Sequence, residues 1–237
     1  MQTTSVFLFG TLRYDPLLQF VAGGQVSVTP AVLTDARCER AEFGDWPVLV
    51  DAPGAQAEGL LIACDGDTLA RLDRYEAVFG YRRHSVQVET DGVQIAAEVW
   101  RPDREDTGSG EPWALEAWVQ AWGSLTIASA ADIMRQLQSR APAEVGQVAH
   151  IIRARADAVL RGRNWRRPGL VGRGFADGDV EVVDRQFPYE RFFSVEEITA
   201  RFRRFDGQDQ REVLRAVFRT TDAATLLPYD PLRDRVL

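Results

Sequence analysis

Residues 7–13, FLFGTLR, and residues 72–83, LDRYEAVFGYRR, are the two stretches of this 237-residue chain that decide the prediction of its fold. The first contains the end of a short apolar strand, residues 6–9, which stops at Gly10. A glycine at this point lets other atoms approach the backbone closely, and the amides that follow it can point at an anion. Taken alone, a glycine at the end of a strand more often indicates only a turn.

The second stretch lies in a helix that the pattern predicts over residues 67–79. Asp67 is the predicted N-cap, because a side-chain carboxylate there accepts a hydrogen bond from a free amide of the first turn. Gly80 follows the last residue, as glycine commonly does at the C-terminal end of a helix. This is the one clear helix predicted among the strands of the N-terminal half.

The apolar stripe of this helix carries a carboxylate. Leu69, Leu72 and Glu76 fall at positions i, i+3 and i+7, so they share one side of the helix. Burial raises the pKa of a carboxyl group toward neutrality, where the group can serve as an acid or a base. The alternative is that Glu76 pairs with Arg82 or Arg83 or turns to solvent. The helix pattern taken alone favours this alternative.

Further short strands are predicted in the N-terminal half, separated by turn signals such as Ala52-Pro53-Gly54-Ala55: residues 25–33, 46–50, 58–64, 84–89 and 94–100. Residues 101–111, RPDREDTGSGE, are charged and rich in glycine, so we expect a loop or tether. Residues 113–140 and 142–161 are then predicted to be two helices, with Pro142 well placed at a helix start.

The C-terminal part follows a stretch rich in arginine. Residues 153–173 contain seven arginines, which indicate a solvated helix end that continues into a linker. A nucleic-acid patch is the less favoured alternative, because Trp165 is the only aromatic residue there that could stack on a base. Alternating apolar and polar residues then predict antiparallel strands at 180–186, 191–195, 198–205 and 212–220, and the chain is expected to end in a hairpin.

The composition is that of a globular protein, with 45% hydrophobic and 27% charged residues. No run of 18 apolar residues is present and the N-terminus lacks a basic region, so we expect no membrane span and a cytoplasmic location. Two cysteines and two histidines are too scattered to predict a disulfide framework or a metal site. All 28 basic residues are arginine, which excludes catalysis by a Schiff-base lysine and phosphate binding by a Walker lysine.

The charge is unevenly distributed along the chain. Residues 1–110 carry nine arginines against 17 acidic residues, and residues 111–237 carry 19 arginines against 18. Such a difference between the two halves favours two structural units over one.

Together, FLFGTLR and LDRYEAVFGYRR resemble the γ-glutamylcyclotransferase family and its AIG2-like relatives over about residues 5–102. The resemblance implies an α+β fold with a small mixed β-barrel and a pocket at its mouth. It implies that a γ-glutamyl compound cyclises to 5-oxoproline and releases an amine, with no cofactor. Phe9 departs from the family pattern, which most often has tyrosine there.

The resemblance also implies the roles of the site residues. Glu76 would take the proton of the substrate's α-ammonium group and then protonate the leaving nitrogen. The backbone amides of Gly10, Thr11 and Leu12 would hold the α-carboxylate or the oxyanion, and Tyr81 would close the pocket. Phe9 is the remaining residue of the expected substrate site. The expected partner is a small γ-glutamyl molecule.

Residues 179–237 resemble the N-terminal part of Nudix ADP-ribose pyrophosphatases, up to the LLPYDP turn. In that family this part is an antiparallel subdomain that pairs across a dimer and helps to clasp adenine. The matching positions are Phe192 and Arg215, which would bind an ADP-ribose-like nucleotide. The alternative is that Phe192 belongs to the core and Arg215 to the surface.

The glutamate-rich Nudix signature that holds magnesium is missing from the sequence. The Arg-Glu pairs at 104–105 and 211–212 lack the downstream Glu-Glu. We therefore expect a protein of a type found in bacteria, a cyclotransferase-like domain (1–110), a helical connector (111–177) and an incomplete Nudix domain (178–237), shortened before its catalytic half. Magnesium would be needed only by that half. The chain is predicted to be an enzyme, a ligand-binding regulatory module or a dimerising scaffold.

Overall fold

A computed structural model describes residues 3–102, 108–164, 177–204, 206, 208 and 212–236. The chain divides into two compact units, residues 1–153 and residues 154–237. Each unit is described by itself below. Within the described ranges, no helix has both the length and the apolar character needed to cross a membrane.

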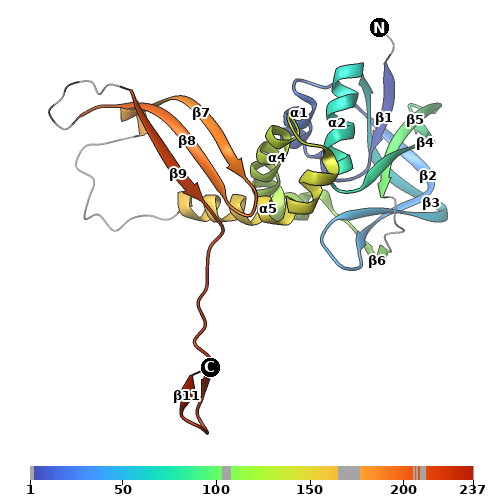
Figure 1. Cartoon of the computed structure of the whole chain (residues 1–237). Coiled ribbons are helices and arrows are strands. Elements are labelled where there is room, and N and C mark those ends of the chain that lie inside the picture. The colour runs from blue at the N-terminus through green and yellow to red at the C-terminus, as the bar shows by residue number, and fades with distance from the viewer. Residues whose placement is uncertain are drawn as a thin grey trace. The chain divides into compact units, whose positions relative to one another are not determined.

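The first unit is built around a closed β-barrel of five strands (Figure 1). These are β1 (Thr4–Leu8), β2 (Val28–Ala41), β3 (Pro47–Cys64), β4 (Tyr81–Thr90) and β5 (Val93–Pro102). Their order is β3-β1-β5-β4-β2, and pairing of β2 with β3 closes the ring. The β1–β5 pair is parallel and the other pairs of the ring are antiparallel. The predicted α+β fold with a small mixed barrel is confirmed.

Strand β1 is buried on both faces, and its alternation separates two cores. Phe7 and Phe9 point into the barrel, where residues such as Val88 and Val99 surround them. Val6 and Leu8 face the opposite way and pack against the helices. A strand between two apolar environments must be apolar at every position, which is why this segment lacks the usual alternation.

The predicted turn at residues 52–55 is wrong, because these residues lie inside the 18-residue strand β3. The register of the β2–β3 pair shifts between Thr34 and Ala36. At this bulge Asp35 has φ 55°, Gly54 has φ 78°, and the Gly54 amide donates to Asp35 Oδ1 at 2.8 Å. The turn-forming residues therefore produce a bulge that bends one long hairpin.

The predicted loop over residues 101–111 is also partly wrong. Residues 103–107 lie outside the described part of the chain, but β6 (Gly108–Pro112) pairs with β2. The buried side chain of Glu39 accepts a hydrogen bond from the Gly110 amide at 2.8 Å. This contact over 71 residues of sequence fixes a segment that has no apolar side chain to bury.

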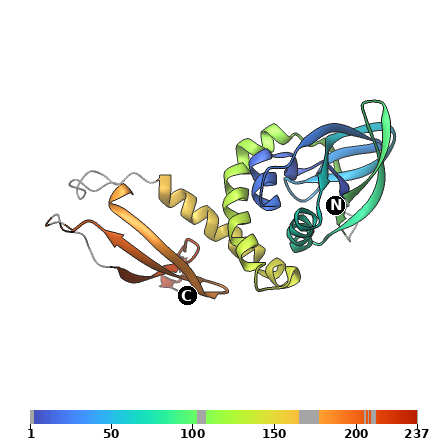
Figure 2. The ribbon, with the colours of Figure 1, turned by 90° about the horizontal axis from the view of Figure 1, so that it is seen from above.

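Two helices pack beside the barrel (Figure 2). Helix α1 (Asp15–Ala22) was not predicted, although Pro16 in its first turn and Gly23 after its end are typical of helix boundaries. Helix α2 (Gly66–Val78) was predicted, but Asp67 is not its N-cap. Asp65 is the N-cap, and its Oδ1 accepts a hydrogen bond from the Thr68 amide at 2.8 Å.

A predominantly helical region follows the barrel, as predicted. It consists of α3 (Leu115–Trp118), a π-helical turn η2 (Val119–Gly123), α4 (Ser124–Gln136) and α5 (Pro142–Asn164). Helix α1 packs against both α2 and α4, and the shared core contains Leu17, Leu72 and Ile133. The predicted linker residues 165–176 lie outside the described residues.

The second unit contains a three-stranded antiparallel sheet in the order β7-β8-β9. Its strands are β7 (Val180–Glu190), β8 (Ser194–Phe202) and β9 (Val213–Arg219), and a short 3-10 turn, η3 (Asp177–Asp179), precedes them. The expected terminal hairpin is present as β10 (Tyr229–Asp230) and β11 (Arg235–Val236). The antiparallel character predicted for this part is therefore confirmed.

The two strands predicted at 191–195 and 198–205 are wrong as separate elements, because β8 runs continuously from Ser194 to Phe202. The polar pair Glu196-Glu197 suggested a break between them. In the structure Glu196 is 5% exposed and pairs with Arg185, while Arg219 lies 3.6 Å away. Two guanidinium groups thus allow a carboxylate to be buried within the strand.

Candidate active site

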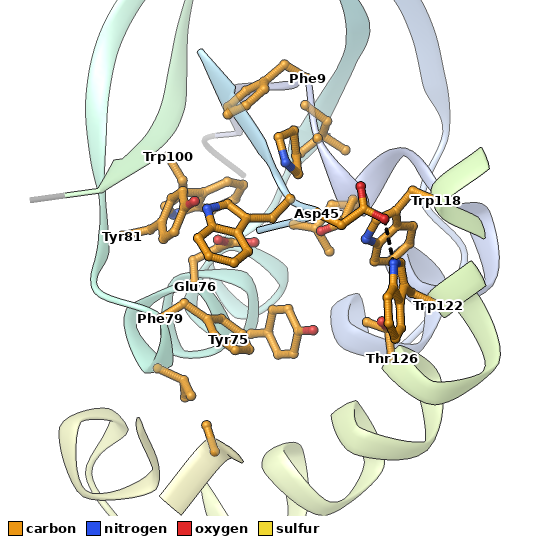
Figure 3. Close-up of a pocket in the computed structure, with 18 of the residues that line it drawn as sticks. Phe9, Asp45, Tyr75, Glu76, Phe79, Tyr81, Trp100, Trp118, Trp122 and Thr126 are labelled. Carbon is orange, nitrogen blue, oxygen red and sulfur yellow. Dashed lines mark hydrogen bonds between the residues drawn. The ribbon is translucent and has the colours of Figure 1, made fainter. Parts of the chain in front are cut away.

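A pocket of about 670 Å³ opens beside the end of β1 (Figure 3). Its wall is rich in aromatic residues, and its charged side chains are Asp45, Glu76 and Arg153. The aromatic lining residues are Phe9, Trp46, Tyr75, Phe79, Tyr81, Trp100, Trp118 and Trp122. Such a pocket is suited to a small organic ligand that is held by apolar contact and oriented by a few polar groups.

The segment that follows β1 forms one wall of the pocket. Residues Leu8 to Leu12 line it, and Thr11–Arg13 form a 3-10 turn, η1, that begins at Gly10. A Cβ atom on Gly10 would lie 2.8 Å from Cγ of Pro47, so the close approach of β3 requires glycine here. The first amides of a helical turn have no acceptor within the turn, which leaves them able to bind an anion.

Glu76 lies in the last turn of α2, and its carboxyl group faces the same pocket (Figure 3). Burial and, to a lesser extent, the nearby negative charge of Asp73 together raise the pKa of Glu76 from 4.5 to about 8. A carboxyl group with this pKa exchanges a proton readily near neutral pH.

Arg83 does not pair with Glu76, contrary to one of the alternatives. Its Nε lies 2.9 Å from Oδ1 of Asp73, which also accepts a hydrogen bond from Nε1 of Trp100 at 3.0 Å. These two contacts hold Asp73 in place near Glu76. The arrangement keeps the carboxylate that perturbs Glu76 in a fixed position.

Two tyrosines complete this part of the wall. Tyr81 begins β4 and is half-buried, while Tyr75 is 4% exposed. Burial raises the pKa of Tyr75 well above its usual range, so its hydroxyl group stays protonated. The structure thus brings all six predicted substrate-site residues to one pocket: Phe9, Gly10, Thr11, Leu12, Glu76 and Tyr81.

Comparison with known proteins agrees with this geometry. Residues 6–120 match the family model described as gamma-glutamyl cyclotransferase, AIG2-like. These residues form a domain of that family. The match includes the barrel, the segment after β1 and Glu76.

Two solved structures are similar to this AIG2-like domain. An AIG2-like protein from Mus musculus is 18% identical, with a TM-score of 0.40, and the similarity covers 48% of this chain and 88% of that one. A structure described as a gamma-glutamyl cyclotransferase is 13% identical, with a TM-score of 0.41, over 63% of this chain and 99% of that one.

A different curated relative is the ADP-ribose pyrophosphatase of Escherichia coli (strain K12). It is 44% identical over 63 residues, which are 27% of this chain and 30% of that protein. The chain therefore spans less than a third of the length of this relative.

Sequence reasoning missed the far wall of the pocket, part of which lies beyond the residues that match the AIG2-like family. The side chains of Trp122, Thr126 and Arg153 come from η2, α4 and α5. Asp45, in the connection between β2 and β3, reaches the same wall and accepts a hydrogen bond from Nε1 of Trp122 at 2.6 Å. Four of the six tryptophans of the chain line the pocket. Their concentration in the first unit is the sequence feature that could have indicated this wall.

The two nucleotide-site candidates of the second unit lie on different elements, Phe192 between β7 and β8 and Arg215 in β9. Phe192 is 68% exposed, so it is not a core residue, and the neighbouring Phe193 instead packs on Tyr189 and Phe218. Arg215 is exposed, and in the register of the two strands it lies opposite Ile198 of β8.

Metal and thiol chemistry have no evident site in the described residues. Among them, no group of three or more histidine, cysteine or acidic side chains is arranged to hold a metal ion. Cys38 and Cys64 are free thiols, and burial raises the pKa of each to about 11. They are therefore protonated and unreactive near neutral pH.

Proposed function

We propose that the AIG2-like domain converts a γ-glutamyl compound to 5-oxoproline and a free amine. The observation that carries this proposal is the carboxyl group of Glu76, with a pKa of about 8, in the same pocket as the amides after β1. The family match of residues 6–120 supports the same reaction.

In this reaction the substrate supplies its own nucleophile, so the protein must mainly transfer protons. The α-amine of the substrate attacks the γ-carbonyl carbon of the same molecule, so the substrate itself supplies the proximity of the reacting atoms. The new C–N bond closes the five-membered lactam ring, and the bond to the leaving nitrogen then breaks. The α-ammonium nitrogen must lose two of its three protons to become the lactam N–H, and the leaving nitrogen gains two when it departs as an ammonium ion.

Glu76 performs both transfers in this proposal. Its carboxylate form accepts a proton of the α-ammonium group, and its carboxylic acid form returns it to the leaving nitrogen. The second proton of the attacking nitrogen passes by way of Glu76 to the released amine, so the carboxyl group ends each cycle as it began. A carboxyl group with an ordinary pKa would be a much weaker base. Burial beside Asp73 raises the pKa of Glu76 toward that of the ammonium group.

The backbone after β1 orients the substrate. The amides of Gly10, Thr11 and Leu12 would bind the α-carboxylate or stabilise the oxyanion that forms at the γ-carbonyl oxygen. Tyr81 would cover the γ-glutamyl group. Phe9 contributes only apolar surface, because it lacks the hydroxyl group of the tyrosine that the family most often has. We propose that this reaction uses no metal and no organic cofactor.

For the second unit we propose a role in binding an ADP-ribose-like nucleotide as part of a dimeric Nudix protein. The similarity to the Escherichia coli ADP-ribose pyrophosphatase supports this role. In such a dimer the clasp would combine Phe192 of one copy with Arg215 of another. Calorimetric titration with ADP-ribose tests it, and Phe192→Ala should weaken any binding about tenfold.

Release of 5-oxoproline from a panel of γ-glutamyl compounds, glutathione included, tests the cyclotransferase. We expect Glu76→Gln to lower kcat by about 10²–10⁴-fold, because the variant has no group that can move the proton. Glu89→Gln, a matched change of an exposed carboxylate on β4, should leave kcat unchanged. Absence of turnover by the folded wild-type protein across the panel would instead favour a ligand-binding module.

A further inference from the structure

The pocket is larger than the γ-glutamyl group requires. That group is the size of a single amino acid, whereas a volume of about 670 Å³ lies in the range of pockets that hold drug-sized ligands, about 300–1,000 Å³. Glu76, Tyr81 and Trp100 lie on one side of the pocket, and Asp45, Trp118 and Trp122 lie on the other side (Figure 3). The second side is therefore available to the leaving amine.

We infer that this second side, formed by Trp118, Trp122 and Asp45, is a subsite for a leaving amine that carries an aromatic ring. The inference rests on the proposed cyclotransferase function and specifies its substrate class, a γ-glutamyl arylalkylamide. The reacting groups would lie at Glu76, and the ring of the leaving amine would stack on the indoles.

The indole of Trp122 is held in place on two sides. Asp45 Oδ2 accepts a hydrogen bond from its Nε1 at 2.6 Å, and the guanidinium carbon of Arg153 lies 5.0 Å from its ring centroid. These contacts come from the β2–β3 connection and from α5, so three separate segments fix one ring. A ring fixed before binding loses little conformational freedom when a ligand stacks on it.

The charges on this side of the pocket already have partners. Asp45 is engaged with Trp122, and Arg153 lies over the same ring. A leaving group with a second ammonium group would compete with the indole for Asp45. A leaving group with a carboxylate would bring a second negative charge to the side of the pocket that holds Asp45. An uncharged aromatic ring does neither.

Aromatic side chains at the pocket are unusually exposed. Phe79 is 47% exposed and Trp46 is 40% exposed, although both line the pocket. Phe79 packs edge-on against Tyr75, with ring centroids 5.3 Å apart. Exposed apolar surface grouped around a cavity indicates a ligand that covers it, and ring–ring contacts favour an aromatic ligand over an aliphatic one.

Part of this subsite lies outside the residues that match the family model, which end at 120. Trp122, Thr126 and Arg153 all follow that limit. The leaving-group preference would thus depend both on matched residues, Asp45 and Trp118, and on Trp122, which lies beyond the matched residues.

The test compares kcat/KM for γ-glutamyl amides that differ only in the leaving amine: phenethylamine, 2-cyclohexylethylamine, 1,4-diaminobutane and alanine. We expect the phenethylamide to exceed the diamine and alanine compounds at least tenfold and the cyclohexylethylamide about two- to tenfold. Trp122→Leu should lower the value for the phenethylamide about tenfold and leave that for the alanine compound within twofold. Phe43→Leu, a matched change of an exposed ring outside the pocket lining, should alter neither.

Preference for the diamine or the alanine compound, or equal rates for the phenyl and cyclohexyl amides, would overturn the inference. Calorimetric binding to Glu76→Gln separates it from the proposed reaction. If no compound turns over but the phenethylamide binds at least tenfold more tightly than the alanine compound, and Trp122→Leu in the same background abolishes the difference, the subsite stands and the proposed reaction is wrong. If the two compounds bind equally, the subsite is wrong.

Discussion

The two units of the chain achieve their structures in different ways. The first closes its strands into a barrel and buries large side chains, such as Phe7, Leu17 and Leu72, completely. In the second, the buried hydrophobic residues among those described are Ala156 and Ala200, while Leu214 is 60% and Phe218 62% exposed. Its buried groups include Glu196 and Arg155, which are charged. The first unit therefore depends on apolar burial, and the second on strand pairing and ion pairs.

The largest expected effect follows directly from this difference. Leu72→Ala should lower the free energy of unfolding of the first unit by about 2–5 kcal/mol, because it leaves a cavity in a fully buried core. Val182→Ala on β7, where the side chain is 41% exposed, should change stability by less than about 0.5 kcal/mol. Denaturant unfolding monitored by tryptophan fluorescence measures the effect of Leu72→Ala. Denaturant unfolding monitored by the circular dichroism of the sheet measures the effect of Val182→Ala. Similar losses for both would show that the second unit has a core of its own.

The pKa of Glu76 predicts a second effect, on stability. Because folding raises this pKa from 4.5 to about 8, the folded state holds a proton that the unfolded state releases, and stability falls as pH rises through that interval. Glu76→Gln removes the effect. The variant should have the same Tm as the wild type below pH 4.5 and a Tm several degrees higher at pH 9. A variant that is less stable than the wild type at pH 9 would contradict the raised pKa.

Helix α5 offers a matched pair of substitutions, one in each unit. A Cβ atom on Gly146 would lie 2.5 Å from the carbonyl oxygen of Val78, so Gly146→Ala must displace α5 from α2. We expect a loss of about 1–3 kcal/mol. At Gly162 no atom lies within 4 Å of such a Cβ, and Gly162→Ala should stabilise the helix by about 0.5–1 kcal/mol. Thermal unfolding of both variants checks the opposite signs.

The smallest effect distinguishes two candidate caps of α2. Asp65→Ala removes the acceptor for the Thr68 amide and should destabilise the first unit by about 1 kcal/mol. Asp67→Ala, at the position predicted from sequence, lies within the helix and should cost only a fraction of that. If urea unfolding shows that the two variants lose equal stability, Asp65 is not the dominant N-cap of α2.

Several features of the first unit could be predicted from sequence because they depend on local patterns. The apolar run of β1, the end of the strand at Gly10 and the helix that carries Glu76 are all set by residues close together in the chain. Helix α1 escaped prediction although Pro16 and Gly23 mark its boundaries, since eight residues give little periodicity. The prediction of two strands in place of β8 was wrong because the sequence of the strand alone does not show that Glu196 pairs with Arg185 and Arg219.

The sequence by itself thus determined the helix α2 and the end of β1 at Gly10, and its resemblance to a known family implied the barrel and the six residues that meet at the pocket. Only the tertiary structure decided what faces them. Asp45 and Trp122 are 77 residues apart and meet through one hydrogen bond, and no local pattern encodes such a contact. The raised pKa of Glu76 is likewise a property of the surrounding atoms, because desolvation arises only when the helices and the barrel are packed together.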